Sequence, residues 1–107
     1  MFDGYIRIAL PFFLVPIKTF KCSDTQKLLS GYAVRRWAAF ERQALRKLEQ
    51  LEWSERLEDL RIPPGNRLKA LNGKRRGQYS IRINDHWRVC FRWAADGACD
   101  VEIVDYH

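Results

Sequence analysis

Side chains that bind metal ions are scarce in this sequence of 107 residues, which has three cysteines and two histidines. Cys22, Cys90 and Cys99 fit no metal-binding spacing, so the sequence argues against a zinc site, and no metal or other cofactor is expected. An odd number of separated cysteines also gives no disulfide framework. Reduced thiols of this kind are typical of cytoplasmic proteins, and a cytoplasmic location is expected.

Long apolar segments are missing as well. The longest apolar run, from Ile8 to Ile17, is too short to cross a bilayer as a helix, and Pro11 and Pro16 interrupt it. The small-x-small cleavage site that ends a secretory signal peptide does not follow this run. The sequence therefore predicts neither membrane insertion nor secretion.

Internal repeats and linkers are absent too, and 107 residues correspond to one domain of common size. What the sequence has in excess is positive charge, with 19 lysines and arginines against 13 acidic residues. The resulting net charge of +6 predicts an anionic partner, which can be nucleic acid, a membrane surface or an acidic protein.

Helical signals fill the first half of the chain. Ser23 and Gln26 have the spacing of a capping box, and Gly31 is placed to end the helix that they begin. A longer helix is expected from Arg35 to Leu51 and a short one from Ser54 to Leu60. The apolar stripe of the long helix is Trp37, Phe40, Ala44, Leu48 and Leu51.

Farther along the chain the hydrophobic period changes to two, which is typical of strands with one buried face. Three segments have this pattern: 78–83 (QYSIRI), 87–93 (WRVCFRW) and 99–104 (CDVEIV). Shorter strands are expected at 17–20 (IKTF) and within 66–71 (NRLKAL). The predicted fold is α+β, with N-terminal helices packed on one face of a small antiparallel sheet.

The turn between the first two of these segments determines which side chains face each other. A three-residue turn at 84–86 keeps the apolar residues on one face, pairing Ile81 with Val89. The same register pairs Arg82 with Arg88 on the face that the helices leave open. Since like charges in opposite positions cost stability, this pair suggests a function on that face.

A five-residue loop at 94–98 is expected between the last two segments. It pairs Phe91 with Val101 and Arg92 with Asp100.

The register of the last two segments also brings the end of the chain to the open face. Val104 opposite Arg88 places Tyr106 diagonally beside Arg88, with His107 one residue further. Guanidinium groups bind phosphate and stabilise a five-coordinate transition state, while histidine titrates near neutral pH. With Asp105 to hold the ring of His107 or raise its pKa, this set suits RNA cleavage without a metal.

Simpler interpretations of the same residues stand beside catalysis. Arginines on a strand are most often a solvated face, and a terminal Tyr-His pair is often a frayed end. A surface that binds an anion without cutting it also satisfies the pattern. Six basic residues are candidates for RNA binding: Lys69, Lys74, Arg75, Arg76, Arg82 and Arg92.

Four motifs together resemble HigB-type toxins of the RelE/ParE superfamily: PPGNRLKAL at 63–71, GQYSIRIN at 77–84, WRVCFRW at 87–93 and the closing DYH at 105–107. The resemblance runs from about Ile17 to His107, as a single RelE-like domain. Residues 1–16 are an apolar extension outside the family pattern, and a start-site artefact with initiation at Val15 is one explanation for them.

The resemblance implies a toxin of a type II toxin-antitoxin system that acts as a ribosome-dependent endoribonuclease. Such a toxin cleaves mRNA in the ribosomal A site, by metal-independent attack of the 2′-hydroxyl, and blocks translation. The implied partners are a HigA-type antitoxin with a helix-turn-helix domain, and the small ribosomal subunit with its mRNA. The family implicates Arg88, Asp105, Tyr106 and His107 in catalysis.

One position departs from the family pattern, because Asn72 stands where many relatives have a lysine before the glycine. If that lysine binds phosphate, Lys69 or Lys74 has to replace it.

Two other functions remain open. One is inhibition of DNA gyrase, as in ParE-like relatives, although these generally lack the DYH ending. The other is a module that binds RNA or regulatory DNA without cutting it.

Overall fold

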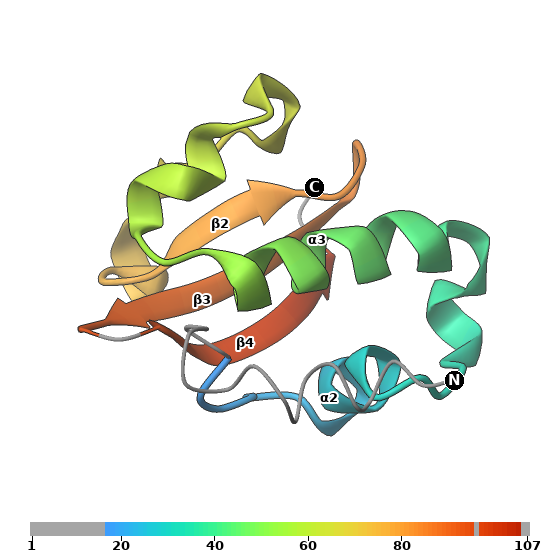
Figure 1. Cartoon of the computed structure of the whole chain (residues 1–107). Helices are drawn as coiled ribbons and strands as arrows, with labels where there is room; N and C mark the ends of the chain where they lie inside the picture. The colour runs from blue at the N-terminus through green and yellow to red at the C-terminus, as the bar shows by residue number, and fades with distance from the viewer. Residues whose placement is uncertain (1–16, 96, 106–107) are drawn as a thin grey trace.

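The computed structural model describes residues 17–95 and 97–105 and has an α+β fold. Two α-helices pack with an antiparallel sheet of four strands in the order β1-β2-β3-β4 (Figure 1). The elements are α2 (Ser23–Leu29), α3 (Glu41–Trp53), β1 (Lys69–Ala70), β2 (Tyr79–Arg82), β3 (Trp87–Ala94) and β4 (Gly97–Asp105). The predicted fold class is therefore confirmed.

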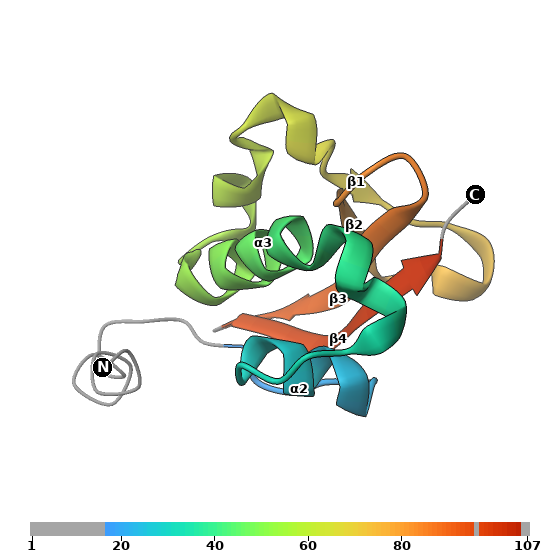
Figure 2. The ribbon, with the colours of Figure 1, turned by 90° about the vertical axis from the view of Figure 1, so that its right-hand side faces the viewer.

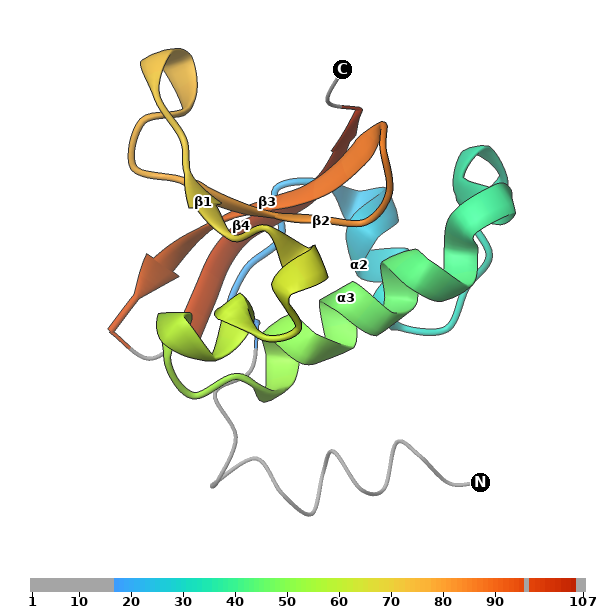
Figure 3. The same cartoon turned by 90° about the horizontal axis from the view of Figure 1, so that it is seen from above.

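The hydrophobic core lies between α3 and one face of the sheet (Figure 2). Leu48 and Leu51 of α3 are completely buried, as are Val89 and Phe91 of β3, and Leu28 of α2 joins the same cluster. This burial confirms the apolar stripe, because residues three and four apart share one face of a helix. Seen from above, the loop at 72–77 projects from the other side of the sheet (Figure 3).

The start of α2 differs from the prediction and its end agrees with it. Cys22 is the N-cap residue and no side chain caps the helix, so Ser23 and Gln26 form no capping box. The backbone N–H of Gln26 instead donates to the carbonyl of Cys22 at 3.3 Å. Gly31 follows the helix with a φ of 100°, the left-handed conformation that commonly ends helices.

The predicted helix from residue 35 to residue 51 is two elements. A 3-10 helix, η1 (Arg35–Phe40), precedes α3, because the backbone of Phe40 leaves the helical region with φ −129° and ψ 25°. Ser54 ends α3, and its Oγ donates to the carbonyl of Gln50 at 2.7 Å, so it caps no following helix. Three further 3-10 helices follow: η2 (Leu57–Arg61), η3 (Pro64–Asn66) and η4 (Gly73–Arg75).

The predicted register around the two arginines is confirmed. In the β2–β3 ladder, Ile81 pairs with Val89 and Arg82 pairs with Arg88. In the β3–β4 ladder, Arg88 pairs with Val104. The end of β4 therefore lies beside Arg88.

The register predicted near the β3–β4 turn is wrong by one residue. The strands continue until Ala94 pairs with Gly97, so the loop predicted at 94–98 does not form. As a result Arg92 pairs with Cys99, where the prediction was Asp100.

A β-bulge in β4 restores the predicted register beyond this point. Between the pairs Cys90–Glu102 and Arg92–Cys99, β3 has one residue, Phe91, and β4 has two, Asp100 and Val101. The predicted one-to-one pairing of Phe91 with Val101 is therefore not formed. The extra residue is accommodated at Asp100, whose φ of 52° is left-handed.

The other predicted strands are shorter than expected. Residues 17–20 contribute one isolated parallel bridge, between Phe20 and Val101. Within 66–71 only β1 forms, because Arg67 has a left-handed backbone with φ 48° and ψ 54°.

Candidate functional site

The sheet face opposite the core carries the predicted basic residues of β2 and β3. Successive side chains of a strand point to opposite faces, so Ser80, Arg82, Arg88 and Arg92 share this face while Ile81 and Val89 point into the core. Arg88 is at its centre, between Arg82 on β2 and Val104 on β4.

Arg88 is buried, with 9% of its surface exposed, although it was expected on an open face. Its Nε donates to Ser80 Oγ at 2.7 Å, and its Nη2 donates to the carbonyl of Arg67 at 2.7 Å and to that of Ser80 at 3.4 Å. The Arg67 carbonyl comes from outside the strands, so alternation of side chains could not reveal it. These bonds fix the plane of the guanidinium group.

Arg82 turns away from Arg88 despite pairing with it in the ladder. Its Nη2 donates to Asp85 Oδ1 within the turn, and its side chain is 34% exposed. The hydrogen bond and the charge of Arg82 lower the pKa of the Asp85 carboxyl. The two guanidinium groups thus have separate partners, which reduces the repulsion expected from their pairing.

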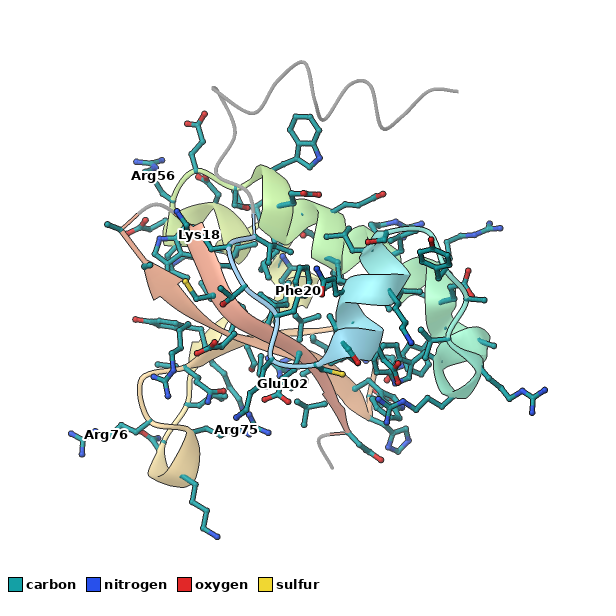
Figure 4. All side chains as sticks on the ribbon, turned by 90° about the horizontal axis from the view of Figure 1, so that it is seen from below. Lys18, Phe20, Arg56, Arg75, Arg76 and Glu102 are labelled. Carbon is teal, nitrogen blue, oxygen red and sulfur yellow. The ribbon has the colours of Figure 1, made fainter. Side chains whose placement is uncertain are left out.

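The loop at 72–77, before β2, carries three basic residues, of which one is hydrogen-bonded to other side chains and two are exposed. Arg75 Nη1 donates to Gln78 Oε1 and to Glu102 Oε2, both at 3.0 Å, and points toward Glu102 while Arg76 projects away (Figure 4). Lys74 and Arg76 are exposed. Arg75 therefore ties the loop to β4, a role that its sequence position did not reveal.

Glu102 is the acidic centre of this part of the face. Besides Arg75 it pairs with Lys21 at 3.8 Å, and its side chain is 17% exposed. Cys90, its partner in the ladder, is completely buried, and this burial raises the pKa of the thiol. A raised pKa makes Cys90 a structural thiol and a poor nucleophile.

Arg92 and Lys69 are the remaining predicted RNA-binding residues, and both are exposed. Arg92 Nε forms an ion pair with Asp100 Oδ2 at 3.6 Å. The two residues are therefore close, as expected, although they are not opposite each other in the ladder. The guanidinium of Arg92 also lies against Gly77, where an added Cβ would be 2.7 Å from Nη1.

Asp105 ends β4 and is exposed. It pairs with Trp87, so alternation places it on the face of Trp87 and not on that of Arg88. Tyr106 and His107, the other residues predicted for catalysis, lie outside the described residues.

A polar cluster beneath the PPGN turn was not predicted from the sequence. Lys47 of α3 donates to Oδ1 of Asn66, which is completely buried. Burial lowers the pKa of Lys47, and the charges of Arg46 and Arg82 lower it further. The one sequence signal was an asparagine directly after Pro-Pro-Gly, in the segment that otherwise supplies β1.

Neither a metal-ligand cluster nor a membrane-spanning helix occurs in residues 17–95 and 97–105. This part of the chain has no group of three His, Cys, Asp or Glu residues that could hold a metal ion. None of its helices is long and apolar enough to span a bilayer.

Comparison with known proteins places this site in a family. A family model described as the RelE-like toxin of type II toxin-antitoxin system HigB matches residues 34–107. Toxin HigB-1 of Vibrio cholerae serotype O1 is 41% identical over 70 residues, covering 65% of this chain and 73% of the relative. An uncharacterized protein of Haemophilus influenzae is 42% identical over 48 residues, covering 45% of this chain and 48% of the relative. The chain therefore belongs to the HigB-type toxins, the RelE-like toxins of type II toxin-antitoxin systems.

Proposed function

We propose that this toxin is a ribosome-dependent endoribonuclease that cleaves mRNA in the A site and so blocks translation. One observation carries the proposal: three hydrogen bonds hold the buried Arg88 guanidinium beside the strand that leads into Asp-Tyr-His. A cation fixed in advance stabilises a charged transition state without reorganising during the reaction.

The proposed reaction begins with attack of a ribose 2′-hydroxyl on the adjacent phosphorus. The 2′-oxygen–phosphorus bond forms, the bond to the 5′-oxygen breaks, and a cyclic 2′,3′-phosphate results. Arg88 donates to the non-bridging oxygens, where negative charge accumulates. Of Tyr106 and His107, one accepts the 2′-hydroxyl proton and the other protonates the departing 5′-oxygen, while Asp105 is assigned the role of orienting the ring of His107.

Exposed basic side chains of β1, β3 and the loop at 72–77 support RNA binding. Lys69, Lys74, Arg76 and Arg92 are exposed, and their charges attract phosphate groups of any sequence. Arg75 contributes indirectly in this scheme, by holding the loop that carries Lys74 and Arg76.

A type II toxin implies an antitoxin partner. We propose a HigA-type antitoxin with a helix-turn-helix domain, and the small ribosomal subunit with bound mRNA as the target. A ribosome that orients the RNA lowers the number of protein groups needed for cleavage, because positioning alone supplies much of a rate enhancement.

Induction of the protein in bacteria, followed by primer extension on translated messages, tests the function. Breaks within codons in the wild type, absent with Arg88→Ala, are the expected result. Intact transcripts with damaged chromosomes would point to gyrase inhibition, and intact transcripts on stalled ribosomes would point to binding without cleavage. Either outcome would overturn the proposal.

A further inference from the structure

We infer that Asn66 is a positioning residue that holds Arg88 through the main-chain carbonyl of Arg67. Its importance for catalysis rests on the proposed function, because it requires that Arg88 acts on RNA. The network runs from α3 through the PPGN turn to the guanidinium, by hydrogen bonds at both ends and by the backbone from Asn66 to Arg67 between them.

The first step anchors Asn66 to the helix. Its Oδ1 accepts from Lys47, and its Nδ2 donates to Gln50 Oε1 at 3.0 Å and to the carbonyl of Leu60 at 3.0 Å. Lys47 and Gln50 are three residues apart and so lie on one face of α3. Because Asn66 is completely buried, loss of these partners would leave polar atoms unsatisfied in the interior, which is unfavourable.

The second step sets the backbone that follows. The N–H of Asn66 donates to the carbonyl of Pro63 at 2.9 Å, and that of Arg67 donates to the carbonyl of Pro64 at 3.1 Å. Arg67 then has φ 48° and ψ 54°, a left-handed conformation that is unfavourable for a residue with a Cβ. Such a conformation persists where the surroundings impose it, and the Asn66 anchor is adjacent.

The third step reaches Arg88. The side chain of Arg67 is exposed, whereas its carbonyl accepts from Arg88 Nη2 at 2.7 Å. Together with the Nε bond to Ser80 Oγ, this bond holds the guanidinium at two of its nitrogens. If the turn relaxes, the carbonyl moves and the guanidinium loses the bond that its Nη2 makes with Arg67.

The effect of such a change differs from that of losing RNA-binding charge. A misplaced transition-state group lowers kcat, whereas loss of uniform binding raises KM. We expect Asn66→Ala to lower kcat about 10- to 100-fold, since small displacements of aligned groups have effects of this size. KM should change less than about threefold, because Asn66 does not reach the surface.

The test compares purified wild-type toxin with Asn66→Ala and Lys47→Met. Gly65→Ala is the matched control in the same turn, because a Cβ there meets no atom within 4 Å. Two readouts are taken on each folded protein: kcat and KM on ribosomes translating a message that the wild type cuts, and exchange of the Arg88 Nε–H by ¹⁵N NMR. The NMR readout is independent of nuclease activity.

We expect Asn66→Ala to speed exchange of the Arg88 Nε–H about tenfold and to lower kcat. Lys47→Met should give a smaller change in the same direction, and Gly65→Ala should match the wild type. If Asn66→Ala does not fold, the Lys47→Met variant provides the test of the positioning role. Wild-type exchange in a folded Asn66 or Lys47 variant, or a raised KM at constant kcat, would overturn the inference. If the wild type cuts no RNA, the proposed function is wrong, whereas the NMR result still shows whether Asn66 positions Arg88.

Discussion

Arg82 and Arg88 are directly opposite each other in the β2–β3 ladder, yet their guanidinium groups have different partners. Arg82 turns to Asp85, and Arg88 turns to Ser80 and the carbonyl of Arg67. Like charges directly opposite in a sheet destabilise it by roughly 0.2–1 kcal/mol, and the Asp85 carboxylate offsets part of that cost. This arrangement keeps a charged, oriented Arg88 beside the end of β4.

Asp85→Asn should weaken the fold in a pH-dependent way. The pKa of Asp85 is lowered by Arg82, so its contribution to stability is present above the ordinary value of 3.8 and is lost as pH falls through the folded value. Urea unfolding should find the variant less stable than the wild type at pH 7, with the difference disappearing below the folded pKa. A pH-independent difference would show that the Arg82–Asp85 ion pair is not its cause.

Arg75 and Glu102 should be energetically coupled. In a double-mutant cycle of Arg75→Met and Glu102→Gln, we expect the stability losses to be non-additive by about 1 kcal/mol, because each change removes the same ion pair. Lys74→Met is the control from the same loop and should be near neutral, since Lys74 is exposed. If the losses of unfolding free energy measured in denaturant titrations are additive, the Arg75–Glu102 ion pair does not stabilise the fold.

Lys74 and Arg76 should contribute to RNA binding without supporting the fold. Each change to Met should reduce the slope of log affinity against log salt by about 1, the value expected for one lost phosphate contact. Arg42→Met removes the same charge from the exposed side of α3 and should leave the slope unchanged. Filter binding to single-stranded RNA over a salt series measures the slope. Equal reductions of the slope in all three variants would indicate attraction by net charge alone.

Arg67→Gly and Arg67→Val should differ in their effect on stability. Glycine adopts the left-handed backbone without steric cost, so Arg67→Gly should preserve stability and kcat, whereas valine should lower stability, because a β-branched side chain tolerates this backbone less well than arginine. Thermal unfolding and the cleavage rate provide the comparison. Loss of kcat in Arg67→Gly would mean that the side chain, and not the carbonyl, is the important group.

The strand register could be predicted because alternation and a short turn left few choices. Ile81 and Val89 both had to face the core, and a turn at 84–86 is the length that allows it. The β3–β4 turn was mispredicted because the bulge at Asp100 depends on a left-handed backbone that hydrophobic alternation does not encode.

The functional residues were harder to predict than the strands. Arg88 was placed correctly in the ladder, but its burial depends on the Arg67 carbonyl, which comes from a turn and not from a strand. Arg75 was grouped with its basic neighbours, although its partner Glu102 is 27 positions away in the sequence. Asn66 carries no charge, and its buried hydrogen bonds join segments that hydrophobic and charge patterns do not connect.

The rate of cleavage with Arg88→Lys tests the central claim most directly. Lysine keeps the charge but lacks the planar fork that holds both Ser80 and Arg67. Single-turnover cleavage of ribosome-bound mRNA at saturating toxin should slow at least about 100-fold, while Arg82→Met changes binding more than the cleavage step. An Arg88→Lys toxin that is folded and cuts at the wild-type rate would contradict the account.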